Sequence, residues 1–130
     1  YVLIGDGESC EGSIWEAIMF AGQQQLNNLV LILDSNGVAM LDYCRNIINL
    51  EPVDQKLRDF QWDVTVLDGH DPDAINETLR KYRQPGGARP KAIIARTVKG
   101  KGVPELETDS MSHIKTLKPD QIAGILGGAA

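Results

Sequence analysis

The amino-acid sequence predicts an α/β fold, in which a doubly wound, mostly parallel sheet carries helices on both faces. Short apolar runs alternate along the chain with segments of helical periodicity, which is typical of strand–helix–strand units. The second run is continuously aliphatic rather than alternating, as expected of a buried parallel strand. The four expected strands are Tyr1–Ile4, Leu29–Leu33, Trp62–Leu67 and Ala92–Ala95.

Caps and prolines mark where the helices between these strands begin. Ser13 and Glu16 have the spacing of a capping box, in which a hydroxyl and a carboxylate satisfy the first backbone amides of a helix. Asp71 followed by Pro72 is a second start signal, because Asp caps well and Pro suits the first helical position. The expected helices are Ile14–Gln25, Pro52–Phe60, Pro72–Arg83 and Pro119–Leu126.

Three connections are expected to lack regular structure. Gly37–Asn49 has no clear periodicity and would form a loop over the carboxyl edge of the sheet. Gln84–Pro90 contains two glycines and two prolines and predicts a solvated turn. Lys99–His113 is a long loop, and long loops often carry the residues of a functional site.

Composition and charge exclude several classes of function. The 130 residues are 42% apolar and 24% charged, which is ordinary for a globular domain. The net charge of −5 argues against nucleic-acid binding through a basic surface, and no apolar run is long enough to cross a membrane. Cys10 and Cys44 form neither a CxxC motif nor a disulfide framework, which fits a reduced, cytoplasmic setting.

Two polar side chains follow the first two strands and stand thirty residues apart. Asp6 lies in a Gly-Asp-Gly turn, and Asn36 lies in the run Asp-Ser-Asn-Gly. One right-handed strand–helix–strand unit brings both loops to the same carboxyl edge of a parallel sheet. A carboxylate, an amide oxygen and nearby carbonyls suit a hard divalent cation that also binds phosphate oxygens. Without the other residue as context, Asp6 could equally cap the turn that follows it, and Asn36 could simply be a residue that turns tolerate.

A longer resemblance surrounds these two side chains. The run GDGESCEGSIWEAIMFAGQQQLNNLVLILDSNG resembles the thiamine-diphosphate motif of the transketolase family, with its GDG turn, EGxxWEA helix and spaced asparagine. The match continues through Leu50–Pro52, Val66–Asp71 and Arg96–Gly102, so it covers nearly the whole chain. The sequence looks most similar to the amino-terminal subunits of split bacterial and archaeal transketolases.

The resemblance implies thiamine diphosphate as cofactor, with Mg²⁺ (or Ca²⁺ or Mn²⁺) bridging its diphosphate to the protein. Asp6 and Asn36 match the family's side-chain metal ligands, and Val38 matches the position whose backbone carbonyl completes the set. Gly7 would join them in binding the cofactor, because a residue without a Cβ lets a backbone amide approach a phosphate closely.

Three further residues match catalytic positions of the family. Glu11 and Glu16 match glutamates at the interface with the pyrimidine-binding domain, which form a relay between active sites; their spacing alone indicates only a loop carboxylate and a capping carboxylate. His113 matches a histidine beside the cofactor diphosphate and the donor hydroxyls, although a lone histidine on a polar loop is usually just exposed. Imidazole donates hydrogen bonds and moves protons near neutral pH.

The chain departs from the family at two places. Tyr43 stands where relatives commonly have glycine, and Ile114 follows His113 where many relatives have glycine. The first change puts substrate choice in doubt more than cofactor binding. His70 also matches a family signature, and we expect its task to be structural. Lys99 is expected in a solvated basic loop, with a phosphate contact as the alternative.

The activity implied is transfer of a two-carbon ketol unit from a ketose, or ketose phosphate, to an aldose or aldose phosphate. A companion subunit with the pyrimidine-binding domain would be required, in a dimer of heterodimers. The alternatives are another thiamine-diphosphate carboligase or 2-oxoacid-using transferase on the same split scaffold, and a non-catalytic partner subunit. A nicotinamide-binding domain is disfavoured because no G-x-G-x-x-G follows the first strand.

The resemblance also bears on domain organisation. The family's cofactor domain has a further segment before the strand that here opens the chain at Tyr1. We therefore expect residues 1–130 to be the carboxy-terminal portion of a thiamine-diphosphate domain that is incomplete at its amino terminus.

Overall fold

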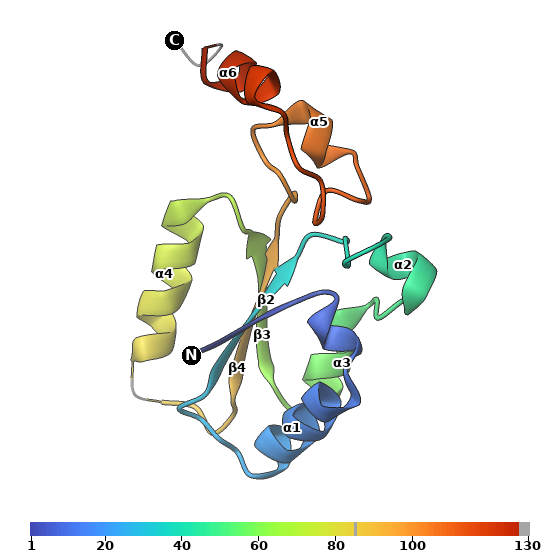
Figure 1. Ribbon diagram of the computed structural model, residues 1–130. Helices are drawn as coiled ribbons and strands as arrows, with labels where there is room; N and C mark the ends of the chain where they lie inside the picture. The colour runs from blue at the N-terminus through green and yellow to red at the C-terminus, as the bar shows by residue number, and fades with distance from the viewer. Residues whose placement is uncertain (85, 128–130) are drawn as a thin grey trace.

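The computed structural model describes residues 1–84 and 86–127. It has three layers, with a twisted sheet between helices (Figure 1). Helices α1 (Gly12–Gln23) and α3 (Val53–Asp59) cover one face, and α4 (Pro72–Arg83) covers part of the other. The predicted α/β architecture with helices on both faces is therefore confirmed.

Four parallel strands make up the sheet in the described residues: β1 (Val2–Gly5), β2 (Val30–Ser35), β3 (Asp63–Asp68) and β4 (Lys91–Arg96). Their spatial order is β1-β2-β4-β3, so the last strand inserts between the second and the third. All three pairings are parallel, which brings the four carboxyl ends to one edge of the sheet. The expected strands are each shifted or extended by one or two residues.

The core lies between the sheet and the pair α1 and α3. Leu57 and Ile94 are almost completely buried there, and Trp62 donates its indole N–H to the carbonyl of Ile18 at 3.0 Å. Gly22 on α1 lies so close to α3 that a Cβ at this position would sit 1.9 Å from the carbonyl oxygen of Phe60. The core cluster is Ile4, Ile18, Ala21, Leu31, Leu33, Val53, Leu57, Trp62, Ala92 and Ile94.

The expected capping box at the start of the first helix is wrong. The helix begins at Gly12 with Glu11 as N-cap, and no side chain caps it. A 3₁₀ turn, η1 (Glu8–Cys10), precedes it directly, and the amide of Ile14 already donates to the carbonyl of Glu11. Ser13 therefore lies inside the first turn. Asp71 is a cap as predicted, because its carboxylate accepts hydrogen bonds from the next helix's first amides.

Two segments expected to be irregular each contain one helical turn. The loop after β2 includes α2 (Cys44–Ile47), and the loop after β4 includes α5 (Pro104–Glu107). A four-residue helix is too short to produce a recognisable 3.6-residue period in the sequence. The last helix, α6 (Pro119–Gly127), agrees with its predicted position.

Strand β1 lies at the edge of the described sheet. It pairs only with β2 there, and Leu3 is 69% exposed. Ile4 is the residue of this strand that is buried in the core cluster. Among the described residues, no helix combines the length and apolarity needed to cross a bilayer.

Candidate cofactor and metal site

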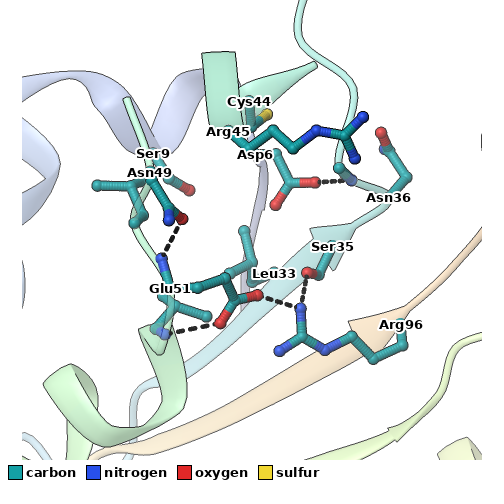
Figure 2. A pocket seen from close by; sticks show the side chains of 13 residues that line it. Asp6, Ser9, Leu33, Ser35, Asn36, Cys44, Arg45, Asn49, Glu51 and Arg96 are labelled. Carbon is teal, nitrogen blue, oxygen red and sulfur yellow. Dashed lines mark hydrogen bonds and ion pairs between the residues drawn. The ribbon is translucent and has the colours of Figure 1, made fainter. Parts of the chain in front are cut away.

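The loops after β1 and β2 meet at the carboxyl edge of the sheet. Gly5 pairs with Asp34 in the ladder, so the following residues leave the sheet side by side. The backbone amide of Gly37 donates a hydrogen bond to Oδ2 of Asp6, which Figure 2 draws as a dashed line beside Asn36. Gly37 has φ of 78°, a left-handed conformation that glycine adopts without strain. The structure thus brings the two predicted metal-ligand loops together.

Two neighbours hold the side chain of Asn36 in one orientation. Its Nδ2 donates to Oδ2 of Asp34 at 3.1 Å, and its Oδ1 accepts from the amide of Val38 at 2.9 Å. Asp34 is itself held by a hydrogen bond from the hydroxyl of Thr97. A carbonyl oxygen has two lone pairs, so Oδ1 of Asn36 keeps one for a further ligand.

Asp6 lies in an electrostatic environment that suits a cation. Burial raises the pKa of its carboxyl above the ordinary value, and the negative charge of Asp34 acts in the same direction. The amide of Gly37 opposes this shift by hydrogen bonding to the carboxylate. A divalent ion bound beside Asp6 would favour the charged carboxylate over the neutral acid and so oppose the effect of burial.

A cavity of about 610 Å³ opens at this edge. His113 reaches it from the loop that follows α5, and Lys99 reaches it from the segment after β4. Glu16 does not line it and is exposed on α1. The structure therefore assembles all the predicted site residues except Glu16 around one cavity: Asp6, Gly7, Glu11, Asn36, Val38 and His113.

A second, smaller cavity of about 310 Å³ is also lined by Asp6. In it, the guanidinium of Arg96 donates to the hydroxyl of Ser35 at 2.7 Å and to Glu51 at 2.5 Å (Figure 2). The other carboxylate oxygen of Glu51 accepts from the amide of Val53 at 3.0 Å. Arg96 thereby ties the far end of the loop after β2 to the carboxyl end of β4.

This ion pair predicts a pH dependence of stability. The hydrogen bond from Arg96 lowers the pKa of Glu51 below its ordinary value. A depressed carboxyl pKa stabilises the fold fully above the unfolded-state pKa and stops doing so as pH falls through the folded-state value. Glu51→Gln should therefore reduce the free energy of unfolding near pH 7, by less than about 1 kcal/mol because the pair is partly exposed.

The difference between wild type and Glu51→Gln should shrink to zero as pH falls below about 4. Urea unfolding of both proteins between pH 3 and 7 measures it. Glu77→Gln, which removes an exposed carboxylate on α4, is the matched control. A Glu51 difference that stays constant across this range would show that the charge of Glu51 does not act through Arg96.

The structural task expected for His70 agrees with its contacts. Its Nε2 accepts a hydrogen bond from the amide of Val98 at 2.8 Å. The preceding Gly69 packs so tightly that a Cβ would lie 2.3 Å from the methyl group of Thr97. This turn supports the segment after β4 that carries Lys99 to the cavity.

Sequence reasoning missed the residues that hold the site residues in place. Asp34 orients Asn36, and the pair formed by Arg96 and Glu51 closes the loop. Asp34 stands two positions before Asn36 at a strand end, so a contact between the two could have been predicted from the sequence. The role of Arg96 could not have been predicted, because it depends on the pairing of β4 with β2, which puts Arg96 opposite Ser35.

A parallel sheet with a carboxylate and an oriented carboxamide at its carboxyl edge has the arrangement in which α/β domains bind their ligands. The family model for the transketolase thiamine diphosphate binding domain matches residues 1–126. The chain belongs to this family, as the sequence motifs predicted.

The relatives include two proteins named transketolase subunits and one named a transketolase-like protein. The chain is 42% identical over 113 residues to the 6-deoxy-6-sulfo-D-fructose transketolase subunit SqwG of a Clostridium species, covering 87% of this chain. It is 38% identical over 122 residues to an apulose-4-phosphate transketolase subunit of Actinobacillus succinogenes, covering 94% of this chain. It is also 38% identical over 131 residues, 97% of this chain, to transketolase-like protein 2 of Mus musculus.

The structural comparison agrees with the sequence comparison. A crystal structure of transketolase from Campylobacter jejuni superposes with a TM-score of 0.86 at 33% sequence identity, over 98% of this chain and 20% of that one. The chain spans 41% and 44% of the two subunits named above, and 20% of the mouse protein. It therefore corresponds to part of each of these relatives.

Proposed function

We propose that this chain forms the diphosphate- and metal-binding part of a transketolase-like enzyme. That enzyme would transfer a two-carbon ketol unit from a ketose, or ketose phosphate, to an aldose or aldose phosphate. The observation that carries the proposal is the meeting of Asp6 with the Asn36 loop, on a chain of the thiamine diphosphate binding family. Thiamine diphosphate supplies a carbon nucleophile and stabilises negative charge on the carbon it attacks.

The donor set fits a cation-bridged diphosphate. Asp6 would give a carboxylate oxygen, Asn36 its Oδ1 and Val38 its backbone carbonyl to Mg²⁺, or to Ca²⁺ or Mn²⁺, with phosphate oxygens and water completing the shell. Gly7 lines the same cavity and has no side chain to keep a phosphate away. Within the described residues no group of three His, Cys, Asp or Glu side chains could hold a metal ion. The proposed site has a single carboxylate, with the oxygens of Asn36, Val38 and the ligand phosphates beside it.

Three side chains would take part in proton transfer and substrate binding. His113 lines the cavity that Asp6 and Asn36 share, from which it would donate hydrogen bonds to diphosphate or substrate hydroxyls. Glu11 lies at the cavity wall, whereas Glu16 is exposed on α1. An exposed Glu16 fits a role at an interface with another protein chain, where the two glutamates would form a carboxylate relay.

A companion chain would complete the enzyme. Two relatives are called transketolase subunits, and this supports a split arrangement for the present chain. The companion would carry the pyrimidine-binding domain in a cytoplasmic dimer of heterodimers, and this chain alone would be inactive. Residues 1–130 would be the carboxy-terminal portion of the thiamine-diphosphate domain.

Calorimetry on the full-length protein with its companion subunit tests the proposal. Thiamine diphosphate titrated in the presence of Mg²⁺ should release or absorb heat at one site per chain, and EDTA should abolish the signal. Absence of binding would refute the proposed cofactor role and favour a non-catalytic partner subunit. A donor screen then separates the enzymes: turnover of ketose phosphates supports ketol transfer, whereas turnover of 2-oxoacids alone would contradict it.

A further inference from the structure

Tyr43 links the loop that carries Asn36 and Val38 to the loop that carries His113. Its hydroxyl donates a hydrogen bond to the backbone carbonyl of Thr108 at 3.1 Å, across 65 positions of sequence. Figure 1 shows the chain after α5 descending toward the loop between β2 and α2. A contact between segments so distant in sequence restricts how the two loops move relative to each other.

The backbone of Tyr43 is fixed on the side of the metal ligands. Tyr43 and Val38 form an antiparallel bridge, and the amide of Cys44 donates to the carbonyl of Gly37 at 2.9 Å. The guanidinium of Arg45 lies 4.6 Å from the centroid of the tyrosine ring, within the range of a cation–π contact. The phenol therefore projects from a loop whose position is defined relative to Asn36.

Thr108 is the first residue of the turn of residues 108–114, which contains His113. Asp109 organises this turn, because its carboxylate accepts from the amide of Met111 at 2.8 Å and from the ammonium of Lys115 at 2.8 Å. The amide of Ser112 donates to the carbonyl of Asp109 at 3.0 Å. The turn is thus well connected internally, and the hydroxyl of Tyr43 attaches Thr108 to the loop that carries Asn36 and Val38.

We propose that Tyr43 is a positioning residue that holds the turn of residues 108–114, and with it His113, against the cofactor cavity. The importance of His113 for catalysis rests on the proposed function, whereas the hydrogen bond from Tyr43 to Thr108 does not depend on that function. Family members with glycine at this position have no hydroxyl to make the contact. The hydrogen bond from Tyr43 to Thr108 therefore depends on the replacement of glycine by tyrosine at this position.

Tyr43→Phe removes the hydroxyl and keeps the ring over Arg45. Loss of one hydrogen bond of ordinary strength should increase amide exchange in residues 108–114 about five-fold. Millisecond hydrogen–deuterium exchange on the full-length protein with its companion measures this. Tyr82→Phe is the matched control, because its hydroxyl bonds Thr65 on the far side of the sheet, and it should leave residues 108–114 unchanged.

Activity provides a second readout that a general loss of stability would not reproduce. Tyr43→Phe should lower kcat about five-fold, with unchanged dissociation constants for Mg²⁺ and thiamine diphosphate, because the metal ligands stay in place. Unchanged exchange in residues 108–114 would overturn the inference, and so would weakened cofactor binding at full kcat. If the wild type failed to bind thiamine diphosphate, the proposed function would fall, whereas the exchange measurement would still decide the role of Tyr43.

Discussion

Asp6→Asn is expected to weaken binding of Mg²⁺–thiamine diphosphate by about 100-fold or more. Removal of an outer-shell partner of a metal ligand already costs about 10- to 100-fold in affinity, and Asp6 would contact the metal directly. Asparagine keeps the shape of the side chain and an oxygen that accepts from the amide of Gly37, so the loop geometry should survive. What is lost is the negative charge that a divalent ion requires.

Calorimetric titration of thiamine diphosphate at fixed Mg²⁺ measures this loss. Asp54→Asn is the matched control, since it removes the same charge from α3, where Asp54 pairs with Arg58. The control should bind the cofactor as the wild type does. Asp6→Asn should also unfold at a urea concentration no lower than the wild type, because burial disfavours the charged form of Asp6. Near-normal cofactor affinity in Asp6→Asn would exclude Asp6 as a metal ligand.

Gly22→Ala is expected to produce a large loss of stability, about 2 to 3 kcal/mol or more in the free energy of unfolding. The added Cβ would lie 1.9 Å from the carbonyl oxygen of Phe60, which is a backbone atom. Relief of the clash requires α1 to move away from the end of α3, where Trp62 and Leu57 are buried. The gain in helix propensity from glycine to alanine, about 1 kcal/mol, is too small to compensate.

Gly12→Ala on the same helix is the control for helix propensity. A Cβ at Gly12 meets no atom within 4 Å, so this variant should be as stable as the wild type or more stable. Urea unfolding of the three proteins, followed by circular dichroism, gives the comparison. If both alanine variants unfolded at the same urea midpoint as the wild type, α1 and the end of α3 would not be in close contact at Gly22.

The local signals in the sequence were sufficient for most of the fold. The aliphatic run before Asp34 predicted a buried parallel strand, and Asp71 with Pro72 predicted a helix start that the structure has at the same residue. The error at Ser13 has a local cause as well. Any Ser with Glu three residues later fits a capping box, whereas the observed start depends on how η1 packs before the helix.

Part of the site was also predictable from local signals. The meeting of the Asp6 and Asn36 loops could be predicted because parallel strands end at one edge of the sheet, and one strand–helix–strand unit separates these residues. The order of residues alone was therefore enough for the strand–helix alternation and for the placement of the two loops at the carboxyl edge. Periodicity of 2 or 3.6 residues is a local property, and it is recorded in the order of side chains along the chain.

The distant residues that meet around that edge became visible only in the folded chain. Insertion of β4 between β2 and β3 places Arg96 against Ser35 and Glu51, and the path of the loop after α5 brings Thr108 to the hydroxyl of Tyr43. These contacts join residues 45 to 65 positions apart. Strand order and loop path depend on packing of the whole chain, and no local pattern in the sequence specifies them.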